Sequence, residues 1–215
     1  MLKYLYLHGF ASSPQSSKAQ YLRSQFQSLG IDLHIPDLNQ ANFTHLTLTR
    51  QIQQASKIME PWEQVVLIGS SFGSLTAAWL TQHPDLYPKI NRLILLAPAF
   101  RFLDHWLPKL GPDQLRHWQT EGVLEVYHYG HKAALPLNYQ FIIDAQKYND
   151  DHLQTPITTL ILHGRQDDVI PIQASRDYAE TRPWTRLIEL EGDHSLGNVQ
   201  PEIWQAVRDF LEISV

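Results

Sequence analysis

The first residue suited to catalysis is a serine with a glycine two positions to either side, in the segment GSSFG at positions 69–73. An apolar run, Val65–Ile68, comes directly before them, and a helical pattern follows. A serine on a sharp strand-to-helix turn has a crowded backbone, so small residues are needed two positions to either side. Ser71 has Gly69 and Gly73 at those positions, which predicts Ser71 as a nucleophile. A glycine-rich turn without a nucleophile is the alternative.

A candidate acid follows a second apolar run, Thr158–Leu162, in the segment HGRQDDVIP at 163–171. A carboxylate in a short loop after a strand can approach a histidine and fix its orientation. Asp167 fits this role best, with Asp168 as the alternative. The acidic pair could instead only cap the helix expected from Ile172, but that would leave the His-Gly turn unexplained.

A candidate base lies in the segment Gly192-Asp193-His194, after the apolar run Arg186–Leu190. A general base needs an imidazole on a loop, where it can take a serine proton and pass it to a leaving group. Among the 11 histidines, only His194 combines a position near the C-terminus, a nearby glycine and a loop after a strand. The three candidates therefore occur in the order Ser71, Asp167, His194.

A fourth segment, His8-Gly9-Phe10, follows the first apolar run, Leu2–Leu7. In a serine hydrolase, two backbone N–H groups stabilise the oxyanion, one of them from the residue after the nucleophile. This predicts the amides of Phe10 and Phe72 as the two donors, with Gly9 allowing close approach. His8 either contacts the active site directly or organises its own loop, and the second interpretation is preferred.

The elements that must position these residues alternate between short apolar runs and longer amphipathic stretches. The candidate strands are Leu2–Leu7, Ile31–Ile35, Val65–Ile68, Leu93–Leu96, Thr158–Leu162 and Arg186–Leu190. The candidate helices are Ser16–Leu29, Leu46–Met59, Phe72–Thr81, Ile172–Glu180 and Gln200–Ile213. Near-continuous Val, Ile and Leu are typical of strands buried on both faces. The pattern predicts an α/β fold, a doubly wound and mostly parallel sheet of about six to seven strands with helices on both faces.

One region, at about 99–155, interrupts the alternation and is rich in aromatic residues. A structureless loop of this length is improbable in a compact domain, so we expect an inserted lid within a single domain spanning 1–215. Within it, Val123–Tyr129 is expected to form a short strand with Gly130 in a turn, and Tyr139–Tyr148 a helix. The aromatic residues could instead only pack the insert onto the sheet.

The composition excludes several classes of function. The net charge is -5 and no Lys/Arg run occurs, which argues against nucleic acid as a partner. No apolar run is long enough to span a membrane, and the N-terminus does not resemble a signal peptide. There is no cysteine, so disulfides and Cys-based zinc sites are excluded. These features favour a cytoplasmic location. Nothing in the sequence indicates an oligomeric state.

The N-terminal run LYLHGFASSP at 5–14, continued by Ser17-Lys18-Ala19, resembles the start of the small bacterial YqiA-type esterases. The segments 69–73 and 192–194 are similar too, and the order of the three candidates matches that of α/β-hydrolases. The insert differs, because its segments 129–130 and 137–145 look more like the lid of hydrolases that include thioesterases and acyl-glucuronide esterases. The resemblance implies carboxylesterase activity on short or medium acyl chains, with no cofactor.

The sequence therefore predicts a carboxylesterase-type serine hydrolase acting on a small ester through an acyl-enzyme. An acyl thioesterase and a perhydrolase would use the same three residues. From another class, the chain could be a binding module on a hydrolase scaffold whose lid blocks the site. A metal site made of His105, His128 and His131 is the weakest hypothesis, because no carboxylate has a suitable spacing.

Overall fold

The computed structural model of the chain describes residues 1–213. Its main sheet has six parallel strands in the order β2-β1-β3-β4-β7-β8. Their bounds are β1 Leu2–Leu7, β2 Leu33–His34, β3 Gln64–Ser70, β4 Ile90–Leu96, β7 Thr159–Gly164 and β8 Thr185–Leu190. This agrees with the predicted parallel α/β sheet, although β2 is shorter than the predicted strand.

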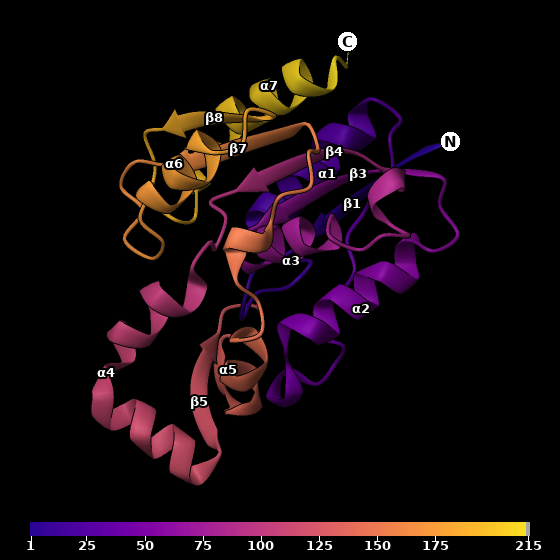
Figure 1. Cartoon of the computed structure of the whole chain (residues 1–215). Coiled ribbons are helices and arrows are strands. Elements are labelled where there is room, and N and C mark those ends of the chain that lie inside the picture. The colour runs from indigo at the N-terminus through magenta and orange to yellow at the C-terminus, as the bar shows by residue number, and fades with distance from the viewer. Residues whose placement is uncertain (214–215) are drawn as a thin grey trace.

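Helices cover both faces of this sheet (Figure 1). Their bounds are α1 Ser17–Ser28, α2 Leu48–Met59, α3 Phe72–Leu80, α6 Gln173–Glu180 and α7 Gln200–Leu211. Alternate residues of each strand point to opposite faces, so the sheet has two apolar layers. Val65 and Leu67 pack in the layer that includes α2 and α3, whereas Val66 and Ile68 pack in the layer of α1 and α7.

Further elements lie between β4 and β7, in the region expected to be an insert. They include the helix α4 (Phe102–Glu121), an antiparallel hairpin of β5 (Val123–His128) and β6 (Ala133–Asn138), and the helix α5 (Gln140–Ala145). Figure 1 shows α4, β5 and α5 below the sheet, on the side where its strands end. The strand at β5 was predicted, as was a helix at α5, which is shorter than the predicted Tyr139–Tyr148. The second strand, β6, and the 20-residue α4 were not predicted.

α4 consists of two helical segments joined at Gly111, whose φ of 75° and ψ of 162° are not helical. Pro112 directly follows this break, so it occupies the first turn of the second segment, where its missing N–H costs nothing. The break lets the helix change direction while continuing to cover the core, and Trp118 in its second half is fully buried.

Candidate active site

Ser71 lies between β3 and α3 with a strained backbone, at φ 52° and ψ -117°. Residues other than glycine rarely adopt a positive φ, and such strain persists only where the surroundings enforce it. The surroundings here are crowded. A Cβ at Gly73 would overlap the carbonyl oxygen of Leu7, and one at Gly69 would overlap the Cα of Ser74. The backbone around Ser71 therefore leaves no space for a side chain at either glycine.

The side chains of Ser71, His194 and Asp167 form one hydrogen-bonded chain. His194 Nε2 is 2.9 Å from Ser71 Oγ, and His194 Nδ1 is 2.7 Å from Asp167 Oδ2. Because a carboxylate only accepts, Nδ1 carries the proton and Nε2 is free to accept one from the serine. The structure thus brings together three residues that are far apart in the sequence. The carboxylate on His194 belongs to Asp167 and not to the alternative, Asp168.

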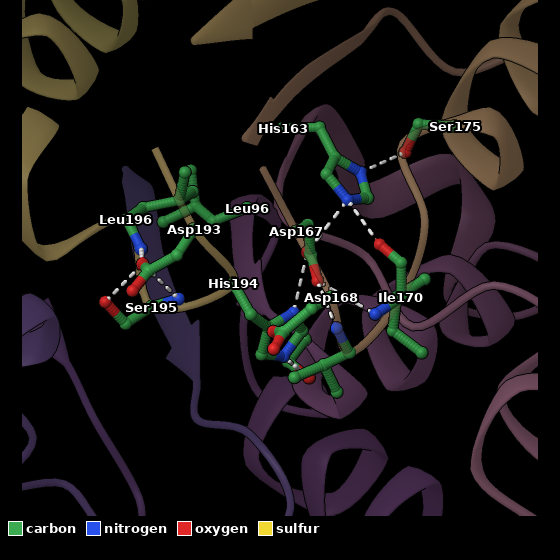
Figure 2. Close-up of polar contacts among 12 residues, drawn as sticks. Leu96, His163, Asp167, Asp168, Ile170, Ser175, Asp193, His194, Ser195 and Leu196 are labelled. Atoms are coloured by element: carbon green, nitrogen blue, oxygen red, sulfur yellow. Dashed lines mark hydrogen bonds and ion pairs between the residues drawn. The ribbon is translucent and has the colours of Figure 1, made fainter. Parts of the chain in front are cut away.

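Asp167 lies between two histidines, as Figure 2 shows. In addition to His194, His163 Nε2 lies 2.9 Å from the same Oδ2, while the other oxygen accepts from the amides of Val169 at 2.9 Å and Ile170 at 2.8 Å. Burial alone would raise the pKa of Asp167, but the hydrogen bonds from His163 and His194 outweigh burial and hold this pKa well below its ordinary value. The carboxylate is therefore ionised, and so suited to stabilise a positively charged imidazole.

His163 is a residue that the sequence analysis missed. It lies at the end of β7, is fully buried, and its Nδ1 is 2.7 Å from the hydroxyl of Ser175 in α6. Its Nε2 faces two acceptors, Asp167 and the carbonyl of Ile170, so Nε2 carries the proton and Ser175 donates to Nδ1. The signal was present in the unexplained His-Gly turn four residues before Asp167.

Lys18 is a second residue that was missed. Its side chain is buried at the start of α1, and burial lowers its pKa to about 8, while the negative charges of Asp167 and Asp193 act in the opposite direction. Buried lysines are rare unless they are paired. The signal lay in the predicted helix, where Lys18 precedes the apolar Leu22 and Phe26 at intervals of four.

The loop after β1 lies beside the serine. A Cβ at Gly9 would be 3.3 Å from the Cβ of Ser71 and 3.8 Å from its Oγ, so the backbone at Gly9 lies close to the serine and a side chain there would crowd it. Within residues 1–213, the Phe10 amide has no backbone or side-chain hydrogen-bond acceptor. The Phe72 amide is the first of α3 and has no partner inside the helix. Both predicted donors therefore belong to segments adjoining Ser71.

His8 is fully buried and both of its ring nitrogens are occupied. Nε2 accepts from the amide of Leu38 at 2.9 Å, and Nδ1 donates to the carbonyl of Gly9 at 3.0 Å. These contacts favour the interpretation that His8 organises its loop. Of the three residues in the weak metal hypothesis, His128 and His131 lie together, with ring centroids 4.6 Å apart. Over residues 1–213, no three His, Asp or Glu side chains are grouped so as to hold a metal ion.

No helix within residues 1–213 is both long enough and apolar enough to cross a membrane.

The protein has the same fold as several solved structures with low sequence identity. Alpha/beta hydrolase domain-containing protein 10 from mouse is 20% identical, with a TM-score of 0.80 over 98% of this chain and 89% of that one. Est1E from Butyrivibrio proteoclasticus, in complex with ferulic acid, is 17% identical, with a TM-score of 0.81 over 98% and 88%. A pyrethroid hydrolase from Sphingobium faniae JZ-2 is 17% identical, with a TM-score of 0.67 over 99% and 98%.

These likenesses identify the α/β-hydrolase fold, as predicted. The sequence pattern of an uncharacterised protein family, UPF0227, matches residues 3–212, which is nearly the whole chain. The YqiA-like resemblance noted at the N-terminus and around Ser71 is consistent with this match. The chain therefore belongs to the UPF0227 family, and its fold is that of the α/β-hydrolases.

Proposed function

We propose that the protein is a carboxylesterase-type serine hydrolase, which cleaves a small ester with a short or medium acyl chain. The observation that carries this proposal is the hydrogen-bonded chain from Ser71 through His194 to Asp167. A pyrethroid hydrolase and polyneuridine aldehyde esterase have the same fold, which supports the same class of reaction.

In the proposed mechanism, Ser71 Oγ attacks the ester carbonyl while His194 Nε2 takes the serine proton. Asp167 holds the imidazole in the required tautomer and stabilises its charged form. The tetrahedral oxyanion accepts hydrogen bonds from the amides of Phe10 and Phe72, each contributing roughly 3–4 kcal/mol to transition-state stabilisation.

The intermediate then collapses. The bond between the carbonyl carbon and the alcohol oxygen breaks, and His194 gives its proton to that oxygen, leaving an acyl group on Ser71. Water, deprotonated by the same imidazole, attacks the acyl carbon in the second half of the reaction. The carboxylic acid leaves and the Ser71 hydroxyl is restored.

The test is a chain-length series on purified protein, with p-nitrophenyl acetate, butyrate and octanoate beside acetyl-CoA and butyryl-CoA. We expect ester turnover that Ser71→Ala reduces at least about a thousandfold. Ser70→Ala is the matched control, because it removes the neighbouring hydroxyl and leaves the glycines and His194 in place. Turnover by Ser71→Ala close to that of the wild type would exclude the proposal, and faster cleavage of the CoA thioesters would redefine the substrate.

A further inference from the structure

The loop that carries the Phe10 amide is held at several points from outside. Ala11, the next residue, is buried with a φ of 50°, a conformation that costs a non-glycine residue about 1–2 kcal/mol and needs support. The side-chain amide of Asn39 donates to the carbonyl of Ser12 at 2.8 Å, and the Leu38 amide donates to His8. These contacts come from the segment that follows β2.

A different group of contacts comes from the tip of the β5–β6 hairpin, residues 128–131. The Tyr129 amide donates to the carbonyl of Ala11 at 2.8 Å, which fixes the peptide of the strained residue. Gly130 packs directly on Ser13, because a Cβ at Gly130 would lie 2.7 Å from Ser13 Cβ and 2.9 Å from its Oγ. The hairpin tip therefore contacts the residues on both sides of Ser12, and position 130 has no space for a residue larger than glycine.

The Phe10 side chain is held by α4 and α5, which also lie between β4 and β7. Its ring contacts those of Trp106 in α4 at 5.3 Å and Phe141 in α5 at 5.1 Å between centroids. It also contacts Phe43, at 5.7 Å, and the ring of Phe43 meets that of His128 at the hairpin tip edge-on, at 4.8 Å. Side chain and backbone of the loop are thus both fixed by the region between β4 and β7.

We infer that the hairpin tip positions the Phe10 amide for the oxyanion, with Gly130 and the Tyr129 amide as positioning groups. This inference rests on the proposed serine-hydrolase function. The region between β4 and β7 then shapes transition-state stabilisation as well as access to the site. A donor that moves by about 1 Å loses much of its effect, because its hydrogen bond is aimed at the oxyanion alone.

The experiment compares Gly130→Ala with the wild type and with the double variant Ser13→Gly/Gly130→Ala. The added methyl group must displace Ser13 and its loop, so kcat for p-nitrophenyl acetate should fall at least about tenfold while KM changes less than about threefold. Ser13→Gly removes the overlapping atoms and should restore most of kcat. Glu125→Ala is the matched control, because Glu125 is an exposed residue of β5 on the same hairpin and has no contact with the loop after β1 within the described residues, so kcat should stay unchanged.

An alkyl trifluoromethyl ketone gives a readout that a purely structural role would not move, because its adduct with Ser71 carries an oxyanion. Its inhibition constant should rise in Gly130→Ala by about the same factor as kcat falls, and recover in the double variant. If Gly130→Ala does not fold, Ser13→Thr takes its place, because it crowds the same contact from the other side. The same fall in kcat and rise in the inhibition constant are expected.

Two contrary results are distinguishable. An active, Ser71-dependent wild type with unchanged kcat and inhibitor affinity in Gly130→Ala would overturn this inference alone. A wild type without Ser71-dependent turnover would overturn the proposed function, and this inference with it.

Discussion

Asp167 accepts hydrogen bonds from two histidines through the same oxygen, and only one of these histidines also contacts Ser71. Both interactions hold the buried carboxylate in one position. His163 is itself fixed by Ser175, so the orientation of the acid depends on a contact between β7 and α6.

We predict that His163→Phe lowers both activity and stability. Phenylalanine keeps an aromatic ring, slightly larger than the imidazole, but lacks both nitrogens. Asp167 therefore loses a charge-assisted hydrogen bond inside the core, worth about 1.5–3 kcal/mol. We expect kcat on p-nitrophenyl acetate to fall about tenfold, with Ser71 still present. Ser175→Ala, which leaves the bond from His163 to Asp167 in place, should have a smaller effect. Wild-type kcat and melting temperature in His163→Phe would refute this role.

The effect of His163→Phe on stability should depend on pH. The pKa of Asp167 is lowered in the folded protein, so its carboxylate contributes stability above its ordinary pKa of about 4, and this contribution is lost as the pH falls below that value. Without the His163 hydrogen bond the pKa of Asp167 should rise toward its ordinary value. The stability difference between His163→Phe and the wild type should therefore shrink below pH 4, as measured by urea unfolding across pH.

The positions of Ser71, Asp167 and His194 could be predicted because each follows a recognisable apolar strand, and parallel strands end at the same edge of the sheet. His163 could not be assigned in this way, since its hydrogen bonds depend on how α6 packs. The sequence places it in the turn after the predicted strand Thr158–Leu162, whereas in the structure it belongs to β7.

At the scale of elements, the strands of the main sheet could be predicted and the region between β4 and β7 only in part. α4 contains Pro108 and Pro112, which normally indicate a helix boundary. Pro112 is tolerated because it begins the segment after the break at Gly111, whereas Pro108 lies inside the first segment. β6 contains Pro136, which is acceptable because β6 pairs on one side only.

Asp150 connects the two ends of the region between β4 and β7. It lies in the short 3-10 helix Asp150–His152. Its carboxylate accepts from the Arg101 amide at 2.7 Å and from Trp79 Nε1 at 3.4 Å. Burial raises its pKa to about 6, and these hydrogen bonds only partly offset that effect. The folded protein therefore favours the neutral acid, and folding becomes less favourable as the pH rises from about 4 to above 6.

We predict that Asp150→Asn stabilises the protein at pH 8, because the amide oxygen can still accept from Arg101 and carries no charge. A gain of about 1 kcal/mol corresponds to a rise in melting temperature of roughly 3 °C in a chain of this size. The advantage should disappear at pH 4, where the wild-type acid is neutral. Asp151→Asn, at the exposed neighbouring position, is the control. A lower melting temperature than the wild type at pH 8 would contradict the prediction.

At the scale of the whole molecule, the region between β4 and β7 shares its core with the sheet. Trp118, Leu137 and Phe141 belong to the same buried cluster as Leu5 and Leu67 of the central strands. We therefore propose that residues 1–213 form one domain with an inserted lid at about 99–155, rather than two units that fold separately. The last two residues of the predicted domain, 214–215, lie outside the described residues.

This proposal predicts a single cooperative unfolding transition. Tryptophan fluorescence, which includes Trp106 and Trp118 of α4, should follow the same urea curve as far-UV circular dichroism, and calorimetric and van't Hoff enthalpies should agree. An earlier transition seen in fluorescence alone would indicate that α4 and its neighbours unfold independently of the sheet.

The central claim is that Ser71 is the nucleophile, and covalent labelling tests it most directly. A fluorophosphonate reacts with a serine that an adjacent base has activated, whatever the natural substrate is. We expect one phosphonyl group per chain by intact mass, located on Ser71 by peptide mapping, and no labelling of Ser71→Ala or of denatured protein. Absence of labelling in the folded wild type, or a label on another residue, would contradict it.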